Sequence, residues 1–169
     1  SGAASGPGTY SIDGEQYVTI TTGWGSAFAL VAGYAYDEGV PSTVGKVVTF
    51  KVGGTGLIAD ADFTAIERTV KADAFGDEAM IAQGAVAFSR NCMVCHGALA
   101  ASSGVLPDLR WSAITGNTDA WKGVVLDGNL AANGMVSFAE FVTPEESEAI
   151  RAYVLAQGHA ATDAAGGEQ

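Results

Sequence analysis

The pattern of apolar and polar residues changes its period about midway along the chain. In the first half, β-branched and aromatic side chains concentrate at residues 9–12, 16–22 and 46–52, which are therefore predicted to form strands. Asp13 and Gly14 predict a two-residue hairpin turn between the first two, because glycine accepts the positive φ of a type I′ turn. Roughly three strands with open edges are too few for an independent β domain, so this half is expected to belong to something larger.

The second half has a helical period. Residues 77–90 carry acidic side chains in the first turn, where the helix dipole favours them, and apolar side chains at helical spacing after it. These apolar residues are Met80, Ile81, Ala85 and Phe88. A second, shorter helix is expected to start at Asn117 or Thr118 and to include Trp121, Val124 and Val125.

The last helix has the clearest start signal. Thr143 is an N-cap residue, Pro144 suits the first helical position, and Glu146 completes a capping box. The helix is expected to run to Gly158, and the small, polar tail from Ala160 is expected to fray. These patterns predict strands in residues 1–56, a connecting segment in 57–75, a mostly helical domain in 76–160 and a flexible tail in 161–169.

The composition narrows the possible partners. Hydrophobic residues make up 48% and charged residues 16% of the 169 residues, which is typical of a globular protein with a core. The net charge of −11 argues against nucleic acid or an anionic membrane surface as a partner, because both would repel the chain. No stretch reaches the roughly 18 to 20 apolar residues that a membrane span requires.

The candidate chemistry lies in the segment Cys92-Met93-Val94-Cys95-His96. Two thiols one helical turn apart can both add to the vinyl groups of one porphyrin, and the histidine that follows then lies under the ring. A redox dithiol shares the cysteine spacing but favours a βαβ context, and a zinc site needs about four ligands. The chain has no other cysteine, and its other histidine, His159, is expected at the surface. Covalent haem c is therefore favoured, with His96 as one axial ligand of the iron.

The second axial ligand is expected to be Met135. Met93 lies inside the attachment segment and Met80 is most simply a core residue, whereas Met135 follows Gly134 in a loop ahead of the last helix. His/Met ligation raises the haem potential and fills both axial positions, so an electron carrier is expected rather than a site for oxygen or substrate.

Two further residues lie between the expected ligands. The carbonyl of Pro107 is a candidate acceptor for the second ring N–H of His96, because ligating histidines usually donate that hydrogen bond. Arg110 is a candidate for neutralising a haem propionate. Ordinary loop roles remain open for both residues.

The motifs resemble those of two known families. Residues 84–88, 92–96, 106–110 and 134–138, followed by Val142-Thr143-Pro144-Glu145-Glu146, resemble a class I cytochrome c domain. Residues 13–18, 23–25 and 45–51 resemble the end of the propeller in quinoprotein alcohol dehydrogenases. Nearly the whole chain is thus similar to the C-terminal end of a quinohaemoprotein alcohol dehydrogenase. It departs from the family pattern at Val136, where a proline commonly follows the methionine, which is expected to alter loop stiffness rather than ligation.

This resemblance implies a mixed fold, in which a few antiparallel strands complete a propeller blade and precede a mostly α cytochrome domain. It also implies that electrons pass from pyrroloquinoline quinone (PQQ) in the propeller part to haem c and then to an external acceptor, such as a small redox protein or a quinone. The propeller part, from the same gene product or a separate chain, would hold PQQ, calcium and the catalytic residues, so this chain alone is not expected to oxidise alcohol. A periplasmic location is implied, and Trp24 is a candidate neighbour of PQQ.

Two alternatives remain open. A free-standing soluble c-type cytochrome with a β extension would be a stable monomer in solution. A dithiol oxidoreductase would lack the Soret band of haem.

Overall fold

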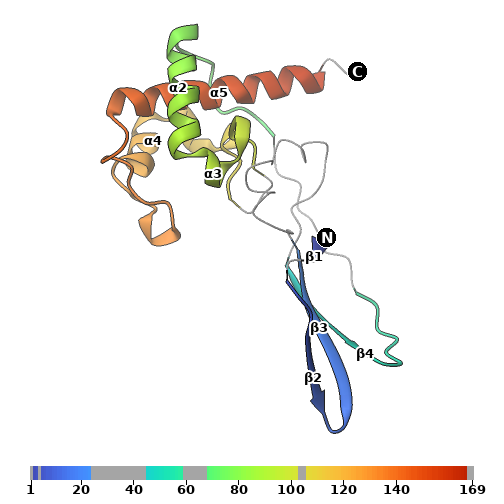
Figure 1. The fold of residues 1–169 in the computed structure, drawn as a ribbon. Helices are drawn as coiled ribbons and strands as arrows, with labels where there is room; N and C mark the ends of the chain where they lie inside the picture. Colours follow the sequence, from blue (N-terminus) through green and yellow to red (C-terminus); the bar gives the residue numbers. More distant parts are fainter. Residues whose placement is uncertain (1, 4, 24–44, 59–67, 103–105, 167–169) are drawn as a thin grey trace.

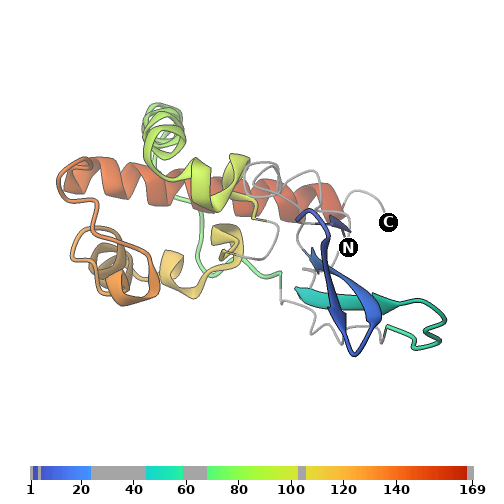
Figure 2. The same cartoon turned by 60° about the horizontal axis from the view of Figure 1, so that its bottom comes forward.

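The computed structural model describes residues 2–3, 5–23, 45–58, 68–102 and 106–166. In these parts the chain forms an antiparallel sheet and a helical domain, and the sheet extends away from the helices in both views of the molecule (Figure 1, Figure 2). Trp24 and most of the glycine-rich stretch that follows it lie outside the described residues.

The sheet is built around its central strand. Its members are β1 (Gly2–Ala3), β2 (Gly8–Ile12), β3 (Glu15–Gly23) and β4 (Lys46–Lys51). β3 pairs with β1 and β2 along one edge and with β4 along the other, always antiparallel. Asp13 and Gly14 have φ values of 53° and 83°, as the predicted type I′ turn requires. The strand β1 was not predicted, because two residues are too few to show a period.

Both faces of the sheet carry apolar side chains that the described residues leave partly exposed. On one face, the rings of Tyr10 and Tyr17 stack with their centroids 5.4 Å apart, and Lys51 pairs with Glu15 nearby. On the opposite face, the paired residues Val18 and Phe50 are 38% and 54% exposed. The sheet therefore offers apolar surface to two sides at once.

The helical domain contains one long helix that crosses a second one. Its helices are α2 (Glu78–Asn91), α3 (Met93–His96), α4 (Thr118–Val125) and α5 (Pro144–Gly166), and 3₁₀ turns occupy Ala98–Ala100, Leu109–Trp111, Ala113–Gly116 and Ala131–Asn133. The starts of α2, α4 and α5 are capped by side chains, of which the capping box at α5 was expected from the sequence. Asp77 accepts a hydrogen bond from the Met80 amide, and Asn117 accepts one from the Ala120 amide. Thr143 and Glu146 form the reciprocal pair of a capping box.

The crossing of α2 and α5 is the centre of the core. A Cβ atom on Gly84 would lie 1.9 Å from the Ala149 carbonyl oxygen, so the two backbones approach at a distance that only glycine allows. One turn further on, the rings of Phe88 and Tyr153 pack with their centroids 5.3 Å apart at an angle of 50°. Trp121, Ile150 and Val154 complete the most buried part of this core.

The last helix is longer than its sequence pattern predicted. Its expected end at Gly158 is wrong, because α5 continues to Gly166, through the segment from Ala160 that was expected to fray. Gly158 lies inside the helix at a close approach, since a Cβ there would meet the Arg110 carbonyl oxygen at 3.0 Å. The alanines beyond it have the highest helix propensity of any residue and continue the helix.

The end of the expected connecting segment is packed onto the helical domain. We call residues 70–76 the strap, because they pack against a 3₁₀ turn and against α5, both of which are far away in the sequence. Its contacts are Val70 against Gly158, the Lys71 carbonyl against Gly116, the Ala72 carbonyl with His159 Nε2 at 2.9 Å, and Phe75 beneath the Arg151 guanidinium at 4.2 Å. His159, expected at the surface, is therefore half-buried and donates its ring N–H to the strap.

Candidate functional site

The segment from Cys92 to His96 is one helical turn. Cys92 is the C-cap of α2, and its carbonyl oxygen accepts hydrogen bonds from the amides of Cys95 at 3.1 Å and His96 at 2.9 Å. These bonds bring the two sulfur atoms and the imidazole onto one turn of backbone. Both cysteines are free thiols, and Cys95 is exposed whereas Cys92 is partly buried.

The His96 ring is buried and held by a backbone carbonyl. Its Nδ1 lies 3.1 Å from the carbonyl oxygen of Pro107, which is the contact expected from the sequence. A carbonyl can only accept, so Nδ1 carries the proton and the neutral ring keeps the lone pair on Nε2 for a metal. Burial lowers the pKa of His96, while the Pro107 carbonyl and the Asp108 carboxylate oppose that shift. The ring is therefore neutral near pH 7, which is the form that ligates metals.

The environment of Cys92 does not suit a redox dithiol. Burial, with a smaller contribution from Cys95, raises the pKa of the Cys92 thiol to about 11. Reactive dithiols usually have a depressed thiol pKa, because the thiolate is the nucleophile. The raised pKa of Cys92 thus argues against a dithiol that exchanges disulfides.

Arg110 is already paired with an acid that the sequence reasoning did not single out. Its side chain is buried, and its Nε and Nη2 atoms lie 3.0 and 2.7 Å from the two carboxylate oxygens of Asp108. Asp108 also caps the 3₁₀ turn by accepting from the Arg110 amide. A haem propionate would be a second anion at this guanidinium, so that role of Arg110 stays a prediction. The spacing Asp-x-Arg was the available signal for the pair.

Met135 lies in a loop that joins two parts of the helical domain. Gly134, at φ 95°, ends the turn Ala131–Asn133, and the Met135 amide donates to the Leu130 carbonyl at 3.2 Å. The Met135 side chain is partly buried against the core. By contrast, the Met80 sulfur lies against Gly76 in the strap. Ligation by Met135 stays a prediction, and Met80 is engaged elsewhere.

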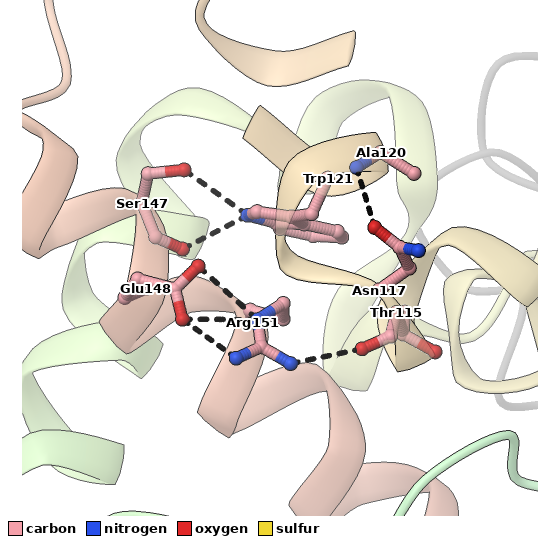
Figure 3. Close-up of polar contacts among 7 residues, drawn as sticks. All are labelled: Thr115, Asn117, Ala120, Trp121, Ser147, Glu148 and Arg151. Atoms are coloured by element: carbon pink, nitrogen blue, oxygen red, sulfur yellow. Dashed lines mark hydrogen bonds and ion pairs between the residues drawn. The ribbon is translucent and has the colours of Figure 1, made fainter. Parts of the chain in front are cut away.

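A polar network that sequence reasoning missed fixes the scaffold around the site (Figure 3). The buried Trp121 indole donates to both the carbonyl and the hydroxyl of Ser147 at 3.0 Å, which joins α4 to α5. Arg151 pairs with Glu148 and donates to the Thr115 carbonyl at 3.1 Å, which joins α5 to the segment between Pro107 and α4. Trp121 and Ser147 are 26 positions apart and Arg151 and Thr115 are 36 apart, so no local pattern could have identified these two contacts, whereas Glu148 and Arg151 are only three apart.

Within the part of the chain that the structure describes, no group of three or more His, Cys, Asp and Glu side chains could hold a metal ion. The same residues include no helix with the length and apolar character needed to cross a bilayer.

Comparison with known proteins identifies the helical domain. Residues 79–154 match the family described as cytochrome c oxidase, cbb3-type, subunit III. The chain is 38% identical to quinohemoprotein alcohol dehydrogenase ADH-IIG of Pseudomonas putida over 94% of its length and 22% of that protein. It is 35% identical to the dehydrogenase subunit of the alcohol dehydrogenase (quinone) of Acetobacter aceti over 92% of its length and 21% of that protein.

The chain is also similar to parts of two solved structures. The structure of ADH-IIG from Pseudomonas putida matches 95% of this chain and 24% of that chain, with a TM-score of 0.79 and 37% identity. The structure of quinohemoprotein alcohol dehydrogenase from Comamonas testosteroni matches 91% of this chain and 22% of that chain, with a TM-score of 0.58 and 23% identity, and supports the fold alone.

The chain spans about a fifth of the length of the curated relatives it matches. Both the strands and the helical domain are included in the match to ADH-IIG, since it covers nearly the whole chain. The chain is therefore similar in sequence and fold to the cytochrome c part of quinohaemoprotein alcohol dehydrogenases, a mostly α domain preceded by antiparallel strands.

Proposed function

We propose that this chain carries a covalently attached haem c and transfers electrons within a quinohaemoprotein alcohol dehydrogenase. The observation that carries the proposal is the single turn that presents Cys92, Cys95 and His96 together, with His96 Nδ1 engaged by the Pro107 carbonyl. The family match of the helical domain supports an electron-transfer role.

The residues present fit such a group. Cys92 and Cys95 offer two free thiols for thioether bonds, His96 offers an unprotonated Nε2, and Met135 offers a partly buried thioether. Bound haem supplies a reversible one-electron couple of its iron. Around it, the protein would orient the imidazole through Pro107 and provide both axial ligands, which leaves no coordination position for a substrate.

The dehydrogenase context rests on the relatives. Their names describe quinohemoproteins, alcohol dehydrogenases (quinone) and a 1-butanol dehydrogenase (cytochrome c). We infer that the electrons come from PQQ in a propeller part, which also holds calcium, and leave to a small redox protein or a quinone in the periplasm. The sheet supports this, because a propeller blade packs against a neighbour on each face, and both faces of this sheet expose large apolar side chains, Tyr10 on one face and Val18 with Phe50 on the other.

The test is the intact mass and visible spectrum of the purified protein, with every polypeptide that accompanies it. A mass increment equal to one haem is expected on the chain. The double variant Cys92→Ala/Cys95→Ala should lose covalent attachment, because neither thioether bond can form. Val94→Ala is the matched control, since Val94 lies in the same turn with its side chain 66% exposed, and it should keep its haem.

The outcomes separate the alternatives. A larger accompanying chain with quinone supports the dehydrogenase. A monomer with haem and no quinone supports a free-standing cytochrome with a β extension. Absence of haem from the parent protein, or covalent haem in Cys92→Ala/Cys95→Ala, would contradict the assignment of the turn.

A further inference from the structure

The loop that carries Met135 is attached to the end of a helix. The last carbonyls of any α-helix lack partners within the helix. At the end of α4, the Phe138 amide donates to the Val125 carbonyl at 2.8 Å, and the Ser137 hydroxyl donates to the Leu126 carbonyl at 2.5 Å. Ser137 and Phe138, which follow Met135 and Val136, are thus anchored by hydrogen bonds to carbonyls at the end of α4.

The turn after α4 is shaped to receive Ser137. Gly128 has φ 71°, and a Cβ atom there would lie 3.1 Å from the Ser137 Cβ. A larger residue would be strained by its backbone and would also press on Ser137. The Ser137 hydroxyl is used a second time, because its oxygen accepts from the Ala139 amide at 3.2 Å. Ser137 therefore joins the turn, the end of α4 and the loop beyond it.

The other flank of Met135 is also fixed. Its own amide donates to the Leu130 carbonyl at 3.2 Å, which belongs to the segment that leads out of the same helix. Met135 lies between these two anchors, with Val136 as the only residue between it and Ser137. A thioether is a weak ligand, so its retention on a metal depends on how firmly the loop holds it in place.

We propose that Ser137 is a positioning residue, which holds the Met135 thioether at the haem iron through its bond to the Leu126 carbonyl. This rests on the proposed function, in which Met135 is an axial ligand. Loss of the hydroxyl would leave the folded domain and the covalent attachment in place and would increase the fraction of molecules with the thioether detached. An external ligand such as imidazole binds to that fraction.

The experiment uses the whole protein with haem attached. Imidazole is titrated into the ferric form while the charge-transfer band of the iron–thioether bond is followed. Ser137→Ala should bind imidazole about fivefold more tightly, the effect of losing one neutral hydrogen bond. Ser137→Thr keeps the hydroxyl and should restore the parent affinity. Ser11→Ala is the control, because Ser11 is also an exposed serine that donates to a carbonyl, that of Glu15.

A second variant changes the residue against which Ser137 packs. Gly128→Ala should displace Ser137 and tighten imidazole binding in the same direction, which keeps the test decisive if Ser137→Ala folds poorly. If Ser137→Ala and Gly128→Ala both bind imidazole like the parent, the positioning role is overturned, even if their thermal stability is lower.

Failure of the proposed function gives a different result. Met135→Ala serves as the reference for complete loss of the thioether. If the parent protein and Met135→Ala have the same spectrum and bind imidazole equally, then Met135 is not a ligand and both proposals fail at that step. If these two differ and Ser137→Ala matches the parent, only the role of Ser137 is overturned.

Discussion

Met135 differs from the other methionines of the chain in its surroundings. Met80 lies against the strap, and Met93 lies within the attachment turn, whereas Met135 stands in a loop anchored on both flanks. This arrangement suits a ligand, because an anchored loop limits the conformational entropy lost when the thioether binds.

Met135→Ala is expected to leave the haem attached, because Cys92 and Cys95 are untouched. Its reduction potential should fall by on the order of 0.1 V, since axial ligands set haem potentials over a range of about 0.8 V and a thioether favours the reduced iron. A redox titration of the intact protein measures this, with Met80→Ala as the control. An unchanged potential in Met135→Ala would remove Met135 from the site.

At this scale, the sequence predicts chemistry that is local in the chain. The turn from Cys92 to His96 could be predicted as an attachment site because covalent attachment of one haem requires neighbouring residues. The Asp108–Arg110 pair is equally local, yet its geometry depends on the 3₁₀ turn between them. The bond from Ser137 to Leu126 crosses eleven positions and depends on how the loop returns to α4, so no spacing rule could predict it.

Among the elements, the crossing of α2 and α5 has the tightest packing requirement. Gly84 permits backbone contact with Ala149, and the Phe88–Tyr153 pair packs beside it. A residue with a Cβ atom at position 84 would force the two helices apart, since the obstacle is backbone and cannot rotate away.

Gly84→Ala is therefore expected to lower the free energy of unfolding by about 2 kcal/mol, in spite of the better helix propensity of alanine. Thermal or denaturant unfolding measures the change. Gly166→Ala is the control at the end of α5, because a Cβ there would meet nothing within 4 Å, and its effect should be small. Equal stability of Gly84→Ala and the parent would show that the helices can separate at little cost.

Helix starts were predictable from sequence and one helix end was not. Side-chain caps such as Asp77, Asn117 and Thr143 act within three residues, so their pattern is visible in the chain. Gly158 suggested the end of α5, but it lies inside the helix. Because it has no side chain, the strap and the Arg110 carbonyl can pack closely against it. A glycine needed for packing and one needed for a cap look alike in a sequence.

In the molecule as a whole, the strap extends the helical domain towards the N-terminus. A domain boundary at residue 76 stays a prediction. Phe75 and Ala72 precede that boundary, yet both contact α5, which follows it. We expect these contacts to contribute to the stability of the cytochrome domain.

A haem-bearing fragment of residues 68–166 should be more stable than one of residues 77–166. Loss of the cation–π contact of Phe75 and the hydrogen bond of Ala72 should cost about 2 kcal/mol, or roughly 10 °C in the melting temperature of a domain this size. Calorimetry of both fragments measures this, with residues 52–166 as the control, which should melt like 68–166. Equal melting of the two shorter fragments would show that the strap contributes nothing.

The strap also shortens the length of chain that connects the sheet to the helical domain. Without it, 26 residues (52–77) would connect β4 to α2, whereas the strap begins after 18 residues (52–69). At full extension these lengths reach about 95 Å and about 65 Å. The strap therefore lowers the greatest possible separation of β4 from the helical domain by about 30 Å.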